Sequence, residues 1–199
     1  MLGNITLLDI IAGKQKRTYV GIGRDTALFA DSAASVTSVM GKRTVKYELF
    51  PANLRRVIEV ASCQLLLSGS YIGSEMQTKD DKQWTARYLH YTFRAERATR
   101  SGIIRHLRAW QTANDTVRQS VLQVVPDEHV LCAEAPDGIT PEGKQAKVAL
   151  RYDDTNICAG IVCEETGRRS VILAFPVESL TGFAAFYQKA VLWLENTSE

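Results

Sequence analysis

Apolar residues along the chain form short continuous blocks and, near the end, one helical stripe. Residues 171–175, VILAF, are apolar without alternation, which is typical of a strand covered on both faces. Residues 5–11 and 64–68 form similar blocks, and we expect them to be buried strands. In residues 181–194 apolar side chains recur at helical spacing, which predicts an amphipathic helix packed on the sheet. Its apolar positions are Phe183, Phe186, Tyr187, Ala190, Val191 and Leu194.

Two further helices are predicted before the middle of the chain. Residues 51–61 begin with Pro51, which suits a first helical position, and carry apolar residues at helical spacing. A second helix should start with Asp80 or Asp81 as its N-cap. The aromatic residues expected on one side of it are Trp84, Tyr88 and Tyr91. Residues 18–47 show no sustained period, and we expect strands or loops there.

The chain is β-rich after Val121. The segments KVALRY, NICAGIVCEE and RRSVILAFPVE read as strands separated by the turn sequences DDT and ETG. The length of 199 residues suits one domain spanning residues 1–199. A composition of 45% hydrophobic and 23% charged residues with net charge +2 is that of a soluble globular protein, without a charge asymmetry that points to nucleic acid or membrane.

No apolar run approaches the roughly 18 to 20 residues that span a bilayer, so we expect no membrane insertion. The N-terminal segment has no basic region ahead of its apolar block, so no export signal is expected in this stretch. The four cysteines show no C-x-x-C spacing, and we expect no metal site and no cofactor. Cys158 and Cys163 lie in one predicted strand and are expected to be small buried hydrophobes on opposite faces.

Residues 65–76, LLLSGSYIGSEM, have the pattern of a nucleophile elbow. Such an elbow places small residues two before and two after the nucleophile, because backbone segments crowd its positive-φ conformation. Here Gly69 and Gly73 frame Tyr71. Tyrosine has an unperturbed pKa of about 10 and is a poor nucleophile near neutral pH without a neighbouring base. Ser68 or Ser70 could act only if the turn were shifted from the usual register.

Three segments together resemble the class I glutamine-amidotransferase-like domain: LLDIIAGKQ, LLLSGSYIGSEM, and RSVILAFPVESL ahead of the amphipathic helix. More narrowly, they resemble modules of Bacteroidetes proteins labelled xanthan lyases. The resemblance implies an α/β fold, a three-layer flavodoxin-like sandwich with a mostly parallel central sheet and a β-rich C-terminal portion. It also implies that this chain is part of a longer exported or cell-surface protein.

The sequence departs from the amidotransferase motif at both catalytic places. Enzymes of that superfamily carry a cysteine in the elbow and a His-Pro-Glu after the last core strand. Tyr71 replaces the cysteine, Phe175 stands where the histidine belongs, and Glu178 is displaced by one residue. His90, His106 and His129 all lie elsewhere in the sequence. The first hypothesis is therefore a non-catalytic module, structural or ligand-binding, of a larger exported protein connected with polysaccharide handling.

The second hypothesis is a lyase or hydrolase acting on acidic polysaccharide through a rearranged site around Tyr71. Its catalytic candidates are Ser70, Tyr71 and Glu178, with arginines holding the substrate carboxylate. In either hypothesis a ligand, with carbohydrate as the expected class, would meet the end of this strand. The ligand-binding candidates are Asp9, Ser68, Gly69, Ser70, Tyr71, Gly73 and Glu75.

The third hypothesis is an interaction module that uses the arginine-rich segment 87–108. Its arginines are Arg87, Arg94, Arg97, Arg100, Arg105 and Arg108, interleaved and flanked by Tyr88, Tyr91, Phe93 and Trp110. Interleaved aromatics and arginines would suit single-stranded nucleic acid. A solvated arginine face above aromatic core residues explains the pattern without a ligand, so nucleic acid is the less favoured partner.

Overall fold

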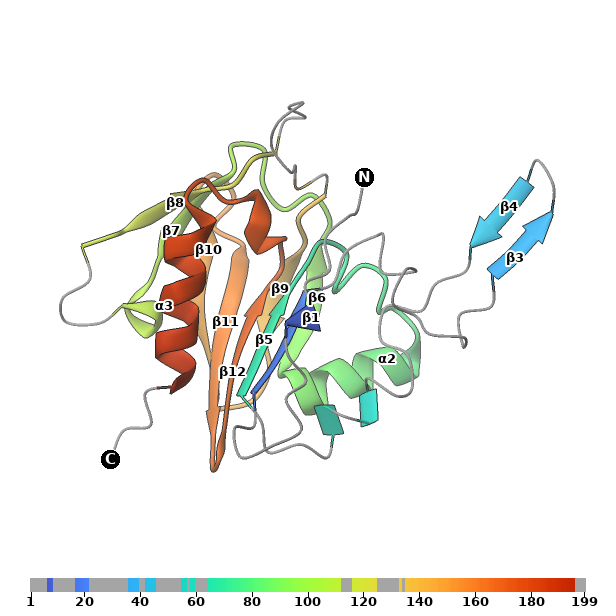
Figure 1. Ribbon diagram of the computed structural model, residues 1–199, viewed down its shortest axis with the longest axis horizontal. Coiled ribbons are helices and arrows are strands. Elements are labelled where there is room, and N and C mark those ends of the chain that lie inside the picture. Colours follow the sequence, from blue (N-terminus) through green and yellow to red (C-terminus); the bar gives the residue numbers. More distant parts are fainter. Residues whose placement is uncertain are drawn as a thin grey trace.

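A computed structural model describes residues 55–56, 58–59, 64–111, 116–124, 133 and 135–195, together with the backbone of four short strands nearer the N-terminus (Figure 1). Ten of its strands form one sheet. They are β1 (Leu7–Leu8), β2 (Arg17–Gly21), β5 (Gln64–Ser68), β6 (Tyr91–Ala95), β7 (Ile103–His106), β8 (Gln119–Val121), β9 (Gly138–Pro141), β10 (Ala146–Tyr152), β11 (Cys158–Glu165) and β12 (Arg168–Leu173). A separate hairpin consists of β3 (Val36–Val39) and β4 (Lys42–Val45).

The sheet is mixed and mostly antiparallel. Its main path runs β1-β2-β5-β12-β11-β10-β7-β8, while β9 joins β11 and β6 joins β9. β5 is parallel to both β2 and β12. The other pairings among the described strands are antiparallel.

The predicted flavodoxin-like sandwich with a mostly parallel sheet is wrong. The described part of the chain is mostly β, and its α-helices with defined bounds are α2 (Lys79–Trp84) and α3 (Phe183–Glu195). The physical reason lies in the connections: residues 153–157 join β10 to β11, and residues 166–167 join β11 to β12. Turns this short join antiparallel neighbours, whereas parallel strands need a crossover of a dozen or more residues.

β12 lies inside the sheet and is covered on both faces, as its unalternating sequence predicts. Val171 and Leu173 belong to one core cluster and Ile172 to the other. Phe186, Ala190 and Leu194 of α3 line the first cluster, and α3 lies along the sheet in Figure 1. The second cluster contains Trp84 of α2 and Leu89 of the π-helical turn η2 (Thr85–Leu89).

The amphipathic helix is confirmed as α3, with one exception in its apolar stripe. Phe186 and the residues one and two turns after it are buried, and the Phe186 ring stacks on Trp110 with ring centroids 5.2 Å apart. Phe183, the first residue of the helix, is 48% exposed, so the contact with the sheet begins one turn later than the sequence predicts.

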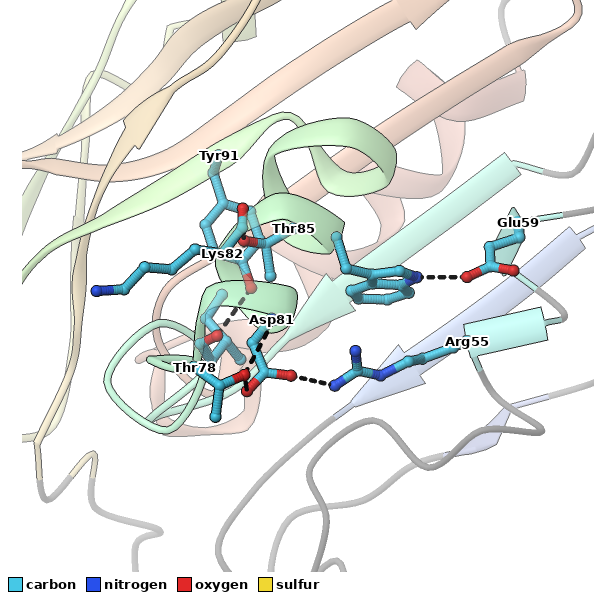
Figure 2. Close-up of polar contacts among 9 residues, drawn as sticks. Arg55, Glu59, Thr78, Asp81, Lys82, Thr85 and Tyr91 are labelled. Atoms are coloured by element: carbon cyan, nitrogen blue, oxygen red, sulfur yellow. Dashed lines mark hydrogen bonds and ion pairs between the residues drawn. The ribbon is translucent and has the colours of Figure 1, made fainter.

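The second predicted helix is shorter than expected and has a different cap. Thr78 is the N-cap of α2, and its side chain accepts a hydrogen bond from the backbone N–H of Asp81 at 3.1 Å. Asp81 also accepts a hydrogen bond from Arg55 Nη2 (Figure 2). Trp84 Nε1 donates to Glu59 Oε1 at 2.7 Å. α2 continues into η2, which ends at His90, whose φ is +57°, so Tyr91 opens β6 instead of extending the helix.

Candidate functional site

The turn after β5 has the backbone conformation that an elbow requires. Tyr71 has φ of +65°, in the left-handed region that only a few non-glycine residues enter. Two hydrogen bonds close the turn, from Glu75 N to Tyr71 O and from Met76 N to Gly73 O, each 3.1 Å long. The glycine-framed pattern therefore identifies a strained turn, with Tyr71 half-buried at its apex.

Both framing glycines are in close contact with neighbouring backbone or side chains. A Cβ on Gly73 would lie 2.8 Å from Phe93 Cδ2 and 3.4 Å from Asp137 Oδ2, so a side chain at this position would force Phe93 to move. Gly69 N donates to Leu173 O at 3.3 Å, which continues the contact between β5 and β12 beyond the end of β5. Gly73 is thus required by packing.

Asp137, which no sequence pattern singled out, holds this turn from the other side. Its Oδ2 accepts hydrogen bonds from Gly73 N at 2.7 Å, Ser74 N at 2.9 Å and Ser74 Oγ at 3.2 Å. The backbone of Asp137 is fixed as well, since its N–H donates to Ala174 O at 2.9 Å and its carbonyl accepts from Tyr152 Oη at 3.0 Å. One buried aspartate thereby ties the turn to the segment just after β12.

Burial raises the pKa of Asp137 to about 6, although the hydrogen bonds from Ser74 and Gly73 act in the opposite direction. The negative charge of Glu96 adds to the rise. Asp137 has no solvent exposure, and within the described part of the chain its Oδ1 has no hydrogen-bond partner. The carboxyl group of Asp137 therefore loses its proton at a pH well above that of an ordinary aspartate.

Ser68 is a structural residue at the end of β5. Its Oγ donates to Phe175 O at 3.0 Å and accepts from Val177 N at 2.7 Å. These bonds fix the start of the short helix η4 (Val177–Ser179), which carries the half-buried Glu178. Ser70 is also buried, and its Oγ has no hydrogen-bond partner among the residues that the structure describes.

The remaining sequence candidates are dispersed. Glu75, two residues after Gly73, is exposed to solvent. Asp9 lies outside the described residues. The structure therefore brings the candidates from Ser68 to Gly73 together on one turn and places η4 beside the end of β5. The missed Asp137 lies in a Pro-Asp-Gly sequence, which reads as an exposed turn, and nothing in the sequence signals its burial.

The histidines that the structure describes are engaged at other places. His90 Nε2 lies 3.1 Å from Glu165 Oε1, and His90 Nδ1 lies 3.0 Å from Gln145 Nε2. His106 is on β7, four strands from β5 along the sheet, with its Nε2 2.8 Å from Ser120 Oγ. His129 lies outside the described residues, as do Cys63 and Cys132.

Cys158 and Cys163 are buried free thiols, as the sequence predicts. Burial raises the pKa of Cys158 to about 11 and that of Cys163 to about 12. At pH 8 only about one in a thousand Cys158 side chains is then a thiolate, and fewer still at Cys163. We expect iodoacetamide at pH 8 to leave both unlabelled in the folded protein and to label both after denaturation. Peptide mass mapping measures this, and rapid labelling of the folded protein would contradict their burial.

Two of the four aromatic residues in and beside the arginine-rich segment are closed to stacking on a base. Tyr91 and Trp110 have no solvent exposure, so their rings cannot stack on a nucleic-acid base. The arginines are spread over η2, β6, β7, the 3-10 turn η3 (Arg108–Trp110) and the connecting loops, and Arg105 pairs with Asp153 at 2.8 Å. A stacking platform in residues 87–108 would therefore have to use Tyr88 and Phe93, which are half-buried.

Neither the known family models nor the curated proteins give a match to this chain. Among the described residues, no group of three or more His, Cys, Asp or Glu side chains is arranged to hold a metal ion. The described helices also include none with the length and hydropathy of a membrane span.

Proposed function

We propose that this chain is a non-catalytic module, structural or ligand-binding, of a larger exported protein connected with polysaccharide handling. The observation that carries the non-catalytic part is the engagement of Asp137 with the turn at Gly73 and Ser74. The exported, polysaccharide-associated setting is supported by the resemblance of residues 65–76 and 169–180 to the modules described above.

The geometry of the turn argues against acyl-transfer chemistry. An enzyme that uses an elbow needs backbone N–H groups directed at the oxygen that becomes negative in the transition state. In an elbow one such donor is the N–H of the residue after the nucleophile, which is Ile72 here. The next two N–H groups, those of Gly73 and Ser74, bind the carboxyl group of Asp137 and are therefore not open to an oxyanion. Tyr71 occupies the nucleophile position and lacks the thiol that forms the covalent intermediate in amidotransferases.

One observation favours the second candidate, a lyase or hydrolase that uses Tyr71 as acid or base. A tyrosine with φ of +65° is strained, and strained residues cluster at active sites and ligand clamps. Tyr71 is also half-buried and not fully enclosed by the protein. Ser70 and Glu178 remain the side chains that would assist it in this alternative.

Turnover assays separate the two candidates. The protein is incubated with glutamine, and ammonia is measured; it is then incubated with acidic and neutral polysaccharides, and new reducing ends and unsaturated sugars are measured. We expect no product above the level of a heat-denatured sample in either assay.

The Tyr71→Phe variant is the matched control, because it keeps the ring and removes only the hydroxyl group. Activity that is present in the wild type and lost in Tyr71→Phe would establish the lyase or hydrolase and overturn the non-catalytic proposal. Activity that both proteins share would overturn it as well and would exclude Tyr71 as its acid or base.

A further inference from the structure

A row of polar side chains crosses three neighbouring strands at one end of the sheet. Gln119 of β8 is directly opposite Arg105 of β7, and Arg105 is directly opposite Arg151 of β10. Directly opposed residues of antiparallel strands lie on the same face of a sheet. With strands about 4.8 Å apart, the row extends over about 10 Å. Two guanidinium groups therefore lie side by side on one face.

That face is the outer one. Ile104 and Tyr152, which alternate with the row on β7 and β10, are fully buried in the core cluster that α3 covers. On the other face Gln119 is exposed, and the side chain of Arg105 is 39% exposed. A ligand in solvent can therefore approach the row.

The two arginines are an unfavourable pair for the fold alone. Like charges directly opposite each other on adjacent strands are destabilising. Asp153 offsets part of this repulsion, because its Oδ1 lies 2.8 Å from Arg105 Nε. A sequence that breaks a local rule in this way does so most often at a functional site, and an anion bound between the two guanidinium groups would remove the repulsion.

Both guanidinium groups are oriented by the same residue. Arg105 Nη2 donates to Asn156 Oδ1 at 2.8 Å, and Arg151 Nη1 donates to the backbone carbonyl of Asn156 at 2.6 Å. Within the described part of the chain, no hydrogen bond uses Nη1 of Arg105 or Nε and Nη2 of Arg151. These donors remain for a ligand.

Asn156 lies in a turn that is itself held in place. Asp154 in this turn accepts hydrogen bonds from Thr99 Oγ1 at 2.9 Å, Arg100 N at 2.8 Å and Ser101 N at 3.1 Å. Asn156 N donates to Tyr152 O at 2.9 Å. The arginines are thus oriented before a ligand arrives, which lowers the entropic cost of binding.

We propose that Gln119, Arg105 and Arg151 form a binding site for an acidic polysaccharide. Guanidinium groups bind carboxylates in bidentate geometry, and the amide of Gln119 both donates and accepts, as sugar hydroxyl groups require. The row itself contains no aromatic side chain on which a nucleic-acid base could stack. This inference rests on the ligand-binding form of the proposed function and names the surface and the ligand class.

Binding of polygalacturonate to the whole chain tests the site, with dextran as the neutral polymer. We expect binding of polygalacturonate that weakens with salt, and no binding of dextran.

Arg105→Gln and Arg151→Gln should each weaken binding about 10-fold, as expected for a charged contact of about 1.4 kcal/mol. Arg56→Gln, an exposed arginine outside the row and outside residues 87–108, is the matched control and should change the affinity less than about 2-fold. Thermal unfolding midpoints should stay within about 2 °C of wild type for all three variants, so that lost binding is not lost folding.

Several outcomes would overturn the assignment. They are a failure of the wild type to bind polygalacturonate, equal binding of dextran, an equal loss in Arg56→Gln, and tighter binding of polyglutamate or single-stranded RNA. Free galacturonate should compete only at far higher concentration than the polymer, and equal affinity would make the ligand a small acid instead. Turnover of the polymer that depends on Tyr71 would overturn the proposed function but leave this site standing, so the two failures are distinguishable.

Discussion

Replacing Asp137 with alanine should lower the free energy of unfolding by about 2 kcal/mol at pH 5, because one buried and one half-buried backbone N–H group lose their acceptor. These groups belong to Gly73 and Ser74, and both bond to the same carboxylate oxygen. At pH 5 most Asp137 side chains are protonated, since their pKa is about 6, so the variant removes an acceptor without removing a buried charge. Urea denaturation followed by tryptophan fluorescence measures the change.

Two controls accompany this variant. Asp137→Asn keeps a carbonyl oxygen for the turn and should lose clearly less stability than the alanine variant. Asp80→Ala removes an exposed carboxylate in the first turn of α2 and should change the unfolding free energy by about 0.5 kcal/mol or less. If the alanine variants at positions 137 and 80 are equally stable, the contact with Asp137 does not hold the turn.

Local patterns predicted the elements that do not depend on distant partners. The unalternating apolar run in β12 correctly indicated a strand covered on both faces. Such a strand needs apolar side chains at consecutive positions, and this is visible in the sequence alone. The stripe of α3 was readable for the same reason, apart from Phe183. The start of α2 was misplaced because Thr78, Asp80 and Asp81 are all good N-caps, and the side chain that bonds decides among them.

The order and direction of the strands could not be predicted in this way. β5 pairs with β12 through Leu65 and Ser170, which are more than a hundred positions apart, and no local pattern records such a pairing. The turn sequences around β10, β11 and β12 did argue for antiparallel neighbours. The resemblance implies a parallel sandwich, which these turns contradict, so the fold expectation is wrong.

The candidate site shows the same division. The spacing of Gly69 and Gly73 predicted the strained turn, and the structure places Tyr71 at φ of +65° within it. The residue that completes the turn, Asp137, is 64 positions from Gly73, and its burial arises from the packing of the whole sheet. Sequence reasoning therefore found the turn and missed the carboxyl group that decides what the turn can do.

The pH dependence of stability should report on that carboxyl group. The pKa of Asp137 is raised to about 6 in the folded protein from 3.8, so the folded state binds more protons than the unfolded state between these values. Its contribution is fully present below pH 3.8 and is lost as the pH rises through about 6. From pH 4 to pH 7 we expect the free energy of unfolding to lose about 2 kcal/mol through this group.

Comparison with Asp137→Asn isolates the effect, because asparagine does not titrate and the other acids are common to both proteins. Asp81 and Asp154 have lowered pKa values, so the stability that they contribute is lost at acidic pH, in the opposite sense to that of Asp137. The difference in unfolding free energy between wild type and Asp137→Asn should therefore move in favour of the variant as the pH rises, by about 2 kcal/mol between pH 4 and pH 7. A difference that stays constant over this range would mean that Asp137 is ionised throughout, and that the turn at Tyr71 is held by a permanent charge.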